Sequence, residues 1–176
     1  MTAPPARPLH VVSGGAGFIG SHVVDALRRA GAPVIVLDAL RRGDANLAHR
    51  RGDPGLVVVE GDAAEPWAPQ IAAARAHLGD PPLAVALHLA AQIDVQRSLA
   101  DPTLDARDNL VSTLRAIDLA IAEGARLLLA SSAAVYGAEA LPAAEASAQW
   151  PRSPDGIHKL ASEMHLRCAA RARGLR

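Results

Sequence analysis

A glycine-rich segment near the amino terminus has the residue types and spacing of a phosphate-binding loop. It reads SGGAGFIG from Ser13 to Gly20. Its glycines match G-x-G-x-x-G when counted from Gly15 and G-x-x-G-x-x-G when counted from Gly14. Glycines are needed here because the turn is tight, because a pyrophosphate must approach the backbone, and because the next helix packs closely on the preceding strand. The N-terminus of that helix would offer N–H groups to the phosphates, so the segment predicts dinucleotide binding.

A carboxylate follows at the distance expected for the adenosine ribose. Asp38 stands 18 residues after Gly20, at the end of the second predicted strand. It can accept hydrogen bonds from both ribose hydroxyls and would repel a 2′-phosphate, which favours NAD over NADP. Arg41 and Arg42 lie close enough in the sequence to leave the choice between the two cofactors open.

Tyr136 and Lys159 are the only tyrosine and the only lysine in the chain. A mechanism that needs either residue type therefore has one candidate for it. Ser132 lies four residues before Tyr136, and Asp155 lies four residues before Lys159. Side chains of these types can orient or transfer a proton, so their positions in the fold matter for function.

The apolar pattern predicts the elements that position these residues. Short β-branched runs predict strands at Leu9–Ser13, Pro33–Asp38, Leu56–Glu60, Leu83–Leu89 and Ala125–Ser131. Stretches of helical period predict helices at Phe18–Ala30, Pro66–Leu78, Leu104–Glu123 and Pro154–Arg173. The segment Ala138–Arg152 is predicted to be a loop.

This alternation of strands and helices is typical of a doubly wound α/β fold. Three of the strands contain continuous apolar runs (VIVL, LVVVE and RLLLAS), which predict a parallel sheet with strands buried on both faces. We therefore expect a Rossmann-type NAD-binding domain with strand order 3-2-1-4-5. The dinucleotide is expected at the switch between the first and fourth strands.

Composition and charge limit the classes of function. The 176 residues are expected to form a single domain, 1–176, that folds without disulfides, and Cys168 is the one cysteine. With 18 acidic and 18 basic residues the net charge is zero, which gives no electrostatic footprint for nucleic acid or a membrane surface. We expect no signal peptide or membrane span and a cytoplasmic protein. No metal site is expected. A structural role, rather than a catalytic one, is expected for His22, His88, His158 and His165.

Seven blocks of sequence, in order, resemble the extended short-chain dehydrogenase/reductase family. They are SGGAGFIGSH (Ser13–His22), VIVLDAL (Val34–Leu40), EGD (Glu60–Asp62), HLAAQIDVQRS (His88–Ser98), DNLVSTL (Asp108–Leu114), SSAAVYG (Ser131–Gly137) and GIHKLASE (Gly156–Glu163). Among the NAD-dependent epimerases and dehydratases of that family, the chain is most similar to nucleotide-sugar epimerases of the UDP-glucose 4-epimerase type. Dehydratases fit less well, because Ala133 and Ala134 replace their acidic pair.

The resemblance implies a residue for each part of NAD. Gly14, Gly17 and Gly20 form the phosphate loop, and Phe18 and Ile19 cover the pyrophosphate. The further implied contacts are Asp38 with the adenosine ribose, Asp62 and Ala63 with the adenine, Leu89, Ala90, Ala91 and Gln92 with the nicotinamide side, Asn109 in the helix that follows, and Lys159 with the nicotinamide ribose.

The chemistry of the family uses a serine, a tyrosine, and a lysine four residues after the tyrosine. Ser132 matches the serine, Lys159 matches the lysine, and Asp155 stands where the family has its tyrosine. Tyr136 matches a different, VYG tyrosine and is expected to pack. Aspartate is much shorter than a phenol and has an ordinary pKa of about 3.9, which Lys159 and a cationic nicotinamide would lower further. Asp155 is therefore expected to be a poor base.

The resemblance implies an NAD-dependent nucleotide-sugar epimerase that acts on a UDP-hexose by transient hydride transfer at a sugar carbon, with impaired turnover in this chain. Two alternatives remain open: a non-catalytic NAD-binding or interaction protein or a fragment, and an NDP-sugar dehydrogenase or reductase. The segments 104–123 and 154–173 match helices that pair in dimers of the family, which predicts a homodimer. The C-terminal substrate domain of the family is expected to be absent from these 176 residues.

Overall fold

Five parallel strands form one sheet, in the order β3-β2-β1-β4-β5, in the computed structural model of the chain. The structure describes residues 7–137 and 142–176. The strands are β1 (Leu9–Ser13), β2 (Val34–Asp38), β3 (Leu56–Glu60), β4 (Leu83–His88) and β5 (Arg126–Leu129). This order confirms the predicted fold, and it brings the carboxyl ends of β1, β2 and β4 together on one side of the sheet.

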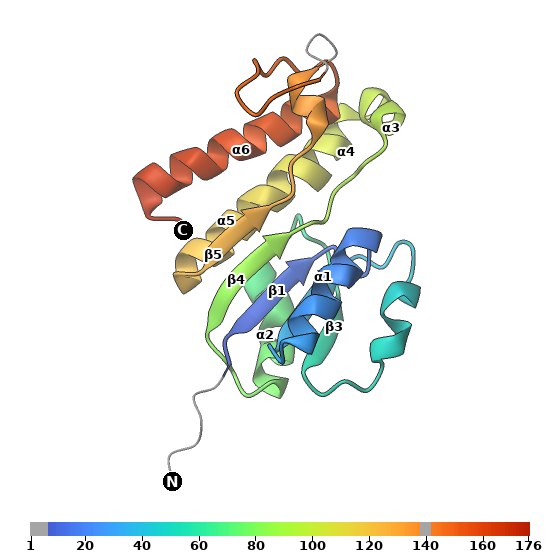
Figure 1. Cartoon of the computed structure of the whole chain (residues 1–176), viewed down its shortest axis with the longest axis vertical. Helices are drawn as coiled ribbons and strands as arrows, with labels where there is room; N and C mark the ends of the chain where they lie inside the picture. The colour runs from blue at the N-terminus through green and yellow to red at the C-terminus, as the bar shows by residue number, and fades with distance from the viewer. Residues whose placement is uncertain (1–6, 138–141) are drawn as a thin grey trace.

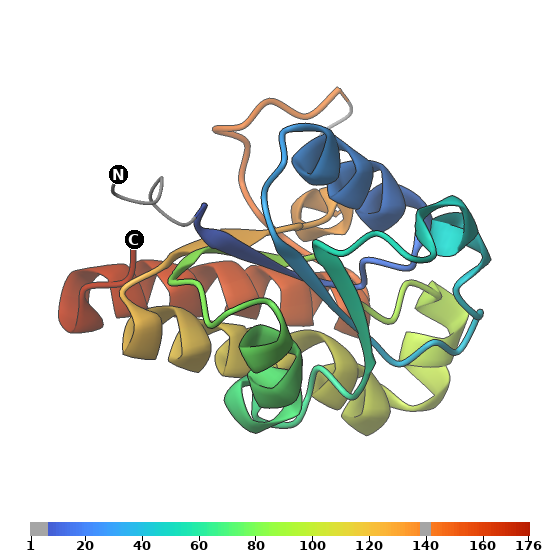
Figure 2. The ribbon, with the colours of Figure 1, turned by 90° about the horizontal axis from the view of Figure 1, so that it is seen from below.

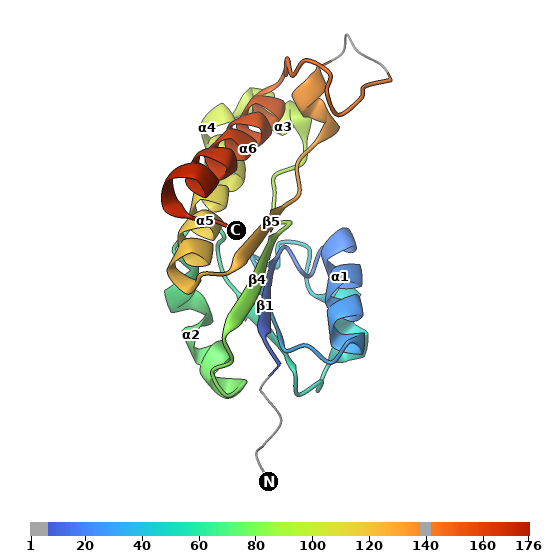
Figure 3. The same cartoon turned by 60° about the vertical axis from the view of Figure 1, so that its left-hand side comes forward.

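Helices cover both faces of the sheet (Figures 1 and 3). Helix α1 (Phe18–Arg29) and the 3-10 helix η1 (Ala45–Arg50) lie on one side, and α2 (Trp67–His77), α5 (Ser112–Glu123) and α6 (Pro154–Arg173) lie on the other (Figure 2). Between β4 and α5 the chain forms α3 (Val95–Ala100), α4 (Pro102–Ala106) and a π-helical turn, η2 (Arg107–Val111). A short 3-10 helix, η3 (Ala133–Tyr136), follows β5.

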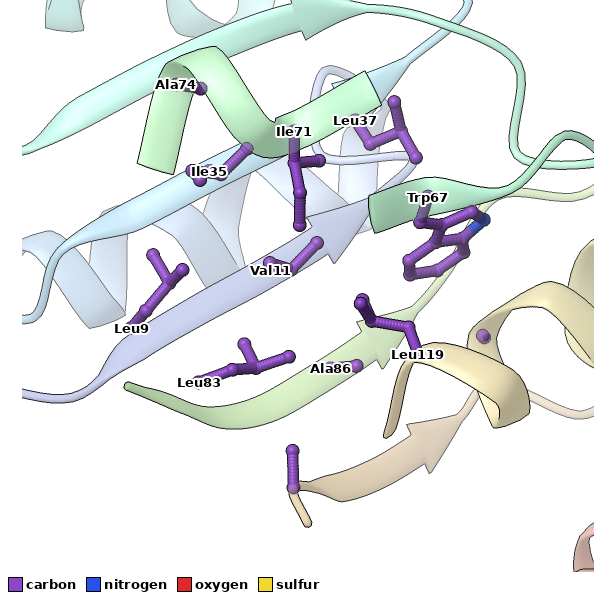
Figure 4. Close-up of a cluster of buried hydrophobic side chains, with 12 residues drawn as sticks. Leu9, Val11, Ile35, Leu37, Trp67, Ile71, Ala74, Leu83, Ala86 and Leu119 are labelled. Atoms are coloured by element: carbon purple, nitrogen blue, oxygen red, sulfur yellow. The ribbon is translucent and has the colours of Figure 1, made fainter. Parts of the chain in front are cut away.

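The larger cluster of buried apolar side chains lies between the sheet and the helices α2 and α5 (Figure 4). Val11, Ile35 and Leu37 of the sheet pack in this cluster with Trp67 and Ile71 of α2, and each is at most 2% exposed. A second cluster lies on the side of α1 and includes Val12, Val24 and Val36. Burial from both sides makes the central strands a firm support for the loops at their carboxyl ends.

The two edge strands are less buried than their sequences predict. Strand β2 is buried on both faces as predicted, but Val58 of β3 is 36% exposed and Leu128 of β5 is 51% exposed. The prediction that all three apolar runs are buried on both faces is therefore wrong for β3 and β5. The reason is their position, because each pairs with a strand on one side only and lies at the margin of the helical layers.

The helix predicted at Leu104–Glu123 begins earlier and is interrupted. It starts at Pro102, where the side chain of Asp101 caps α4 by accepting a hydrogen bond from the N–H of Leu104 (2.9 Å), and it passes through the π-helical turn before α5. Helix α3 was not predicted, since its six residues are too few to show a helical period. Asp94 caps it by accepting hydrogen bonds from two N–H groups of its first turn.

Helix α6 has its predicted bounds and α5 ends at the predicted residue, Glu123, whereas α1 and α2 are one residue shorter than predicted at one end and at both ends, respectively. Ser153 caps α6 by accepting a hydrogen bond from the N–H of Gly156 (3.3 Å), and Pro154 takes the first helical position. Gly124 ends α5 in a left-handed conformation, with φ +61°. Within the described ranges, no helix combines the length and the apolar character needed to cross a membrane. Residues 138–141 of the predicted loop lie outside the described residues.

Candidate functional site

The glycine loop joins β1 to α1 and leaves the N-terminus of α1 without a side-chain cap. Gly14 has φ +71°, a left-handed conformation that favours glycine. A Cβ on Gly14 would lie 2.6 Å from the backbone nitrogen of Ala90, so the loop lies directly against the segment that follows β4. Gly17 is the N-cap of α1, and no side chain bonds to the first-turn N–H groups there. These groups are therefore open to a phosphate.

The residues after Gly17 begin α1 and complete the glycine loop. Phe18 and Ile19 begin α1 with 76% and 66% of their surface exposed, so they can cover a phosphate group bound at the helix end. Gly20 is buried, and a Cβ on it would overlap the carbonyl oxygen of Gly14. Open N–H donors, and glycines that let the loop pack closely on the backbone around it, both fit the pyrophosphate of NAD.

Asp38 ends β2 beside the glycine loop. Its carboxylate accepts the N–H of Ala16 at 3.0 Å and the N–H of Leu40 at 2.9 Å. Leu40 has φ +50°, so the chain turns sharply just after Asp38. The two backbone hydrogen bonds orient the carboxylate, and each oxygen keeps a further lone pair that a ribose hydroxyl can use.

Asp62 and Ala63 follow β3, and Asp62 has a cationic partner that the sequence did not indicate. Arg107 of η2 lies 2.5 Å from the Asp62 carboxylate and 3.4 Å from that of Glu65. Burial alone would raise the pKa of the Asp62 carboxyl, but the hydrogen bond and the charge of Arg107 hold that pKa below its usual value. The carbonyl of Ala63 accepts the indole N–H of Trp67 (2.8 Å). The segment predicted to contact adenine is therefore held firmly on both sides.

A buried polar network fixes the segment Leu89–Gln92 beside the glycine loop. The side-chain carbonyl of Asn109 accepts the N–H of Gln92, and its amide donates to the carbonyl of Gln92, both at 3.1 Å. At the other end of the segment, the N–H of Leu89 donates to the carbonyl of Ser13 (3.0 Å). Ala90 and Ala91 lie between these two anchors, which places all four residues at the carboxyl ends of β1 and β4.

The network continues through Asp105, which sequence reasoning missed. One oxygen of this fully buried carboxylate accepts hydrogen bonds from the side-chain amides of Gln92 (2.9 Å) and Asn109 (3.0 Å). The other oxygen lies 2.7 Å from Nδ1 of His158 on α6. The spacing of four between Asp105 and Asn109 puts both on one helix face, but nothing in that spacing shows that α6 approaches there. Among the described residues, no cluster with the ligands of a metal site is present.

His88, at the end of β4, is buried between two serines. Its Nδ1 lies 2.6 Å from the hydroxyl of Ser13, and its Nε2 lies 3.1 Å from the hydroxyl of Ser112. Burial, with a further contribution from the positive charge of Lys159, lowers the pKa of His88 to about 3. These contacts agree with the structural role expected of this histidine.

We expect His88 to weaken folding in acid. The unfolded chain protonates this ring below its ordinary pKa of 6.5, whereas the folded protein does so only near pH 3. The unfolded state therefore binds more protons in this window, and His88 lowers the free energy of unfolding by about 2 kcal/mol between pH 7 and pH 5. Urea unfolding at both pH values measures the drop. In His88→Gln the drop should be smaller by about the same amount, and an equal drop in both proteins would contradict the assignment.

Ser132 follows β5, and Lys159 binds the backbone of the same segment. The ammonium of Lys159, which is buried on α6, donates to the carbonyl of Ala130 (3.3 Å), two residues before Ser132. Burial lowers the pKa of Lys159, and the carboxylates of Asp155 and Asp105 oppose that shift. The hydroxyl of Ser132 accepts the N–H of Ala134 (3.1 Å) and so caps η3.

Asp155 is buried in the first turn of α6, one turn before Lys159. The sequence predicts a pKa of Asp155 below its ordinary value, because Lys159 is close by. Lys159 does lower this pKa, but the net shift is upward, so the predicted overall direction is wrong. Burial and then the negative charge of Asp105 raise that pKa by more than Lys159 and His158 lower it. The sequence shows the lysine on the same helix but not Asp105, which approaches from α4. The carboxylate of Asp155 is therefore more basic than predicted. Its side chain is still much shorter than that of the tyrosine that it replaces.

A doubly wound parallel sheet, with an open helix N-terminus after β1 and a carboxylate at the end of β2, defines a dinucleotide-binding α/β domain. The sequence profile of the NAD dependent epimerase/dehydratase family matches residues 10–176. The chain belongs to this family, and the NAD dependence of the family confirms the predicted cofactor.

The relatives of the chain include UDP-glucose 4-epimerases. It is 36% identical to that of Azospirillum brasilense over 97% of this chain and 47% of the relative, and 37% identical to that of Mycolicibacterium smegmatis over 89% and 49%. The solved structure of the Thermus thermophilus UDP-glucose 4-epimerase with NAD matches with 31% identity and a TM-score of 0.78, over 96% of this chain and 52% of that one. The chain thus spans about half the length of the curated relatives that it matches.

Proposed function

We propose that this chain is the NAD-binding part of a nucleotide-sugar epimerase of the UDP-glucose 4-epimerase type, with turnover impaired by Asp155. The observation that carries the proposal lies on α6. Lys159 is buried and its ammonium donates to the carbonyl of Ala130, two residues before Ser132, while the residue one turn earlier on α6 is an aspartate. The similarity to UDP-glucose 4-epimerases supports a UDP-hexose as the substrate.

In the proposed epimerisation, each of these residues would have a separate role. NAD+, when bound, supplies a hydride acceptor that returns the hydride to the sugar. Ser132 orients the sugar hydroxyl, and Lys159 hydrogen-bonds the nicotinamide ribose and places a positive charge beside the hydroxyl that loses its proton. The carboxylate of Asp155 has to receive that proton across a longer gap than a phenol would. A base has to be within hydrogen-bond distance of the proton before its pKa affects the rate.

A comparison of the wild type with Asp155→Tyr tests this proposal. We expect the wild type to bind NAD+ but to interconvert UDP-glucose and UDP-galactose slowly or not at all. The substitution returns a phenol to the position four residues before Lys159, and it should raise turnover by about 10²- to 10⁴-fold, the usual contribution of a positioned acid or base. Turnover is measured as interconversion of the two sugar nucleotides, and NAD+ binding by calorimetric titration.

Asp155→Phe is the matched control, because it fills the same space without a hydroxyl. An equal gain in both variants would show that packing, not proton transfer, limits the wild type. Rapid turnover by the wild type would refute the impairment by Asp155. A folded wild type that binds neither NAD+ nor NADP+ would overturn the cofactor-binding role itself.

The same aspartate favours a second candidate, a non-catalytic NAD-binding protein. Such a protein would bind NAD+ and gain no turnover from Asp155→Tyr. An NDP-sugar dehydrogenase or reductase would instead release NADH, or consume it, in step with the sugar nucleotide, which absorbance at the reduced nicotinamide band detects.

We further propose a cytoplasmic homodimer formed through α5 and α6. These helices pack against each other. Ile157 and Met164 of α6 are 50% and 60% exposed, and their spacing of seven puts them on one face of the helix. An exposed apolar stripe on this helix supports its contact with a second copy of the chain. Sedimentation analysis of the wild type and of a variant with both side chains replaced by serine would test the dimer.

A further inference from the structure

Four residues form a chain of alternating charges across the adenosine end of the candidate site. The guanidinium of Arg41 lies 2.9 Å from the carboxylate of Asp108. Asp108 lies 3.3 Å from Arg107, and Arg107 lies 2.5 Å from Asp62. Arg41 follows β2, Asp62 follows β3, and the two central members belong to η2, the π-helical turn after β4. The chain of ion pairs thus links three of the segments at the carboxyl side of the sheet.

The ion pair with Asp108 fixes the position of the Arg41 guanidinium. The side chain of Asp108 is 8% exposed, whereas that of Arg41 is 54% exposed. A carboxylate with so little access to water depends on its cationic partners, since removing a partner leaves a poorly solvated charge. The side chain of Arg41 therefore points toward η2 and is engaged there, although its backbone lies three residues after Asp38, beside the ribose position.

We propose that Asp108 is a specificity-determining residue that helps the chain to select NAD over NADP. In this fold an arginine near the end of the second strand is the group that accommodates a 2′-phosphate. Asp108 withholds Arg41 from that role by pairing with it, while Asp38 repels the phosphate directly. The choice left open by the position of Arg41 in the sequence is thus decided by its partner. This proposal rests on the binding of a nicotinamide dinucleotide at the glycine loop.

The charge balance around this partner agrees with the proposal. The carboxylates of Asp38, Asp62, Glu65 and Asp108 outnumber the guanidinium groups of Arg41, Arg42 and Arg107, so a dianionic phosphate meets a net negative surrounding. Neutralising Asp108 leaves its shape but releases Arg41 and removes one negative charge. Both changes favour a 2′-phosphate, and neither alters a group that contacts the ribose hydroxyls.

Calorimetric titration of the full chain with NAD+ and with NADP+ tests the proposal. In an Asp38→Asn background, which removes the direct repulsion, adding Asp108→Asn should strengthen NADP+ binding by about tenfold, the usual value of a charged hydrogen bond. The affinity for NAD+ should stay within about twofold, because its ribose carries no phosphate. Adding Arg41→Ala to the double variant should remove the gain.

Asp118→Asn is the matched control. Asp118 also pairs with an arginine, Arg173, at 3.3 Å, but it lies on α5 and not among the segments of the candidate site. It should change neither affinity. The proposal would be overturned if the gain in NADP+ affinity persisted after Arg41→Ala, or if it disappeared only after Arg42→Ala. Unchanged NADP+ affinity on adding Asp108→Asn to the Asp38→Asn background would overturn it too. A folded wild type without NAD+ binding would overturn the proposed function, and this inference with it.

A second comparison avoids any change at Asp108, whose carboxylate also pairs with Arg107. In the Asp38→Asn background alone, Arg41→Ala should leave NADP+ affinity within about twofold, because Asp108 already withholds the guanidinium. A loss of about tenfold, the value of a charged hydrogen bond, would show that Arg41 is free to bind the phosphate and would overturn the proposal.

Discussion

Replacing Asp105 with leucine is expected to lower the free energy of unfolding by about 3 to 5 kcal/mol. The carboxylate of Asp105 is 1% exposed and binds three side chains: the amides of Gln92 and Asn109, and the ring of His158. Leucine has a similar size but accepts no hydrogen bond, so two buried amides and the partly buried ring of His158 lose a partner at once. Urea unfolding at pH 7 measures the change.

Asp118→Leu is the control for this substitution. Asp118 lies on the exposed side of α5, about half exposed, where replacing it should change stability by less than about 0.5 kcal/mol. Asp105→Asn keeps one acceptor oxygen and should fall between the two. If Asp105→Leu costs no more than Asp118→Leu, the network around Asp105 does not hold α4 against α6.

Gly14→Ala is expected to cost about 2 to 5 kcal/mol and to abolish NAD+ binding. The residue has φ +71°, and its Cβ would lie 2.6 Å from the nitrogen and 2.8 Å from the Cα of Ala90. Both are backbone atoms, which cannot move aside as a flexible side chain can. The segment after β4 and the phosphate loop must therefore separate, which displaces the N–H groups that would hold the pyrophosphate. Unfolding in urea and titration with NAD+ measure the two effects.

Gly43→Ala separates backbone strain from steric overlap. Gly43 has nearly the same φ, +72°, but a Cβ there would have no atom within 4 Å. Its replacement should cost about 1 to 2 kcal/mol, the strain of a left-handed alanine alone. Equal costs at the two positions would mean that the close approach to Ala90 is not the reason that position 14 needs glycine.

The local pattern of the sequence predicted most of the fold. The strands at Leu9–Ser13 and Leu56–Glu60 and the helix at Pro154–Arg173 have the predicted bounds, because apolar period and capping residues act within a few positions. The same reasoning failed where the outcome depends on neighbours in space. The exposure of Val58 and Leu128 follows from their edge strands, and the π-helical turn η2 has no period of its own in the sequence.

The sequence by itself determined the phosphate loop, the carboxylate Asp38, and the aspartate that replaces a tyrosine four residues before Lys159. Each of these is a matter of residue type and short spacing along the chain. Only the tertiary structure decided the partners of these groups. His158 and Asp105 are 53 positions apart, and Arg41 and Asp108 are 67 positions apart. Hydrogen bonds and charge interactions depend on distance in space and on burial, and the packing of α4 and η2 against α6 and the loops sets both.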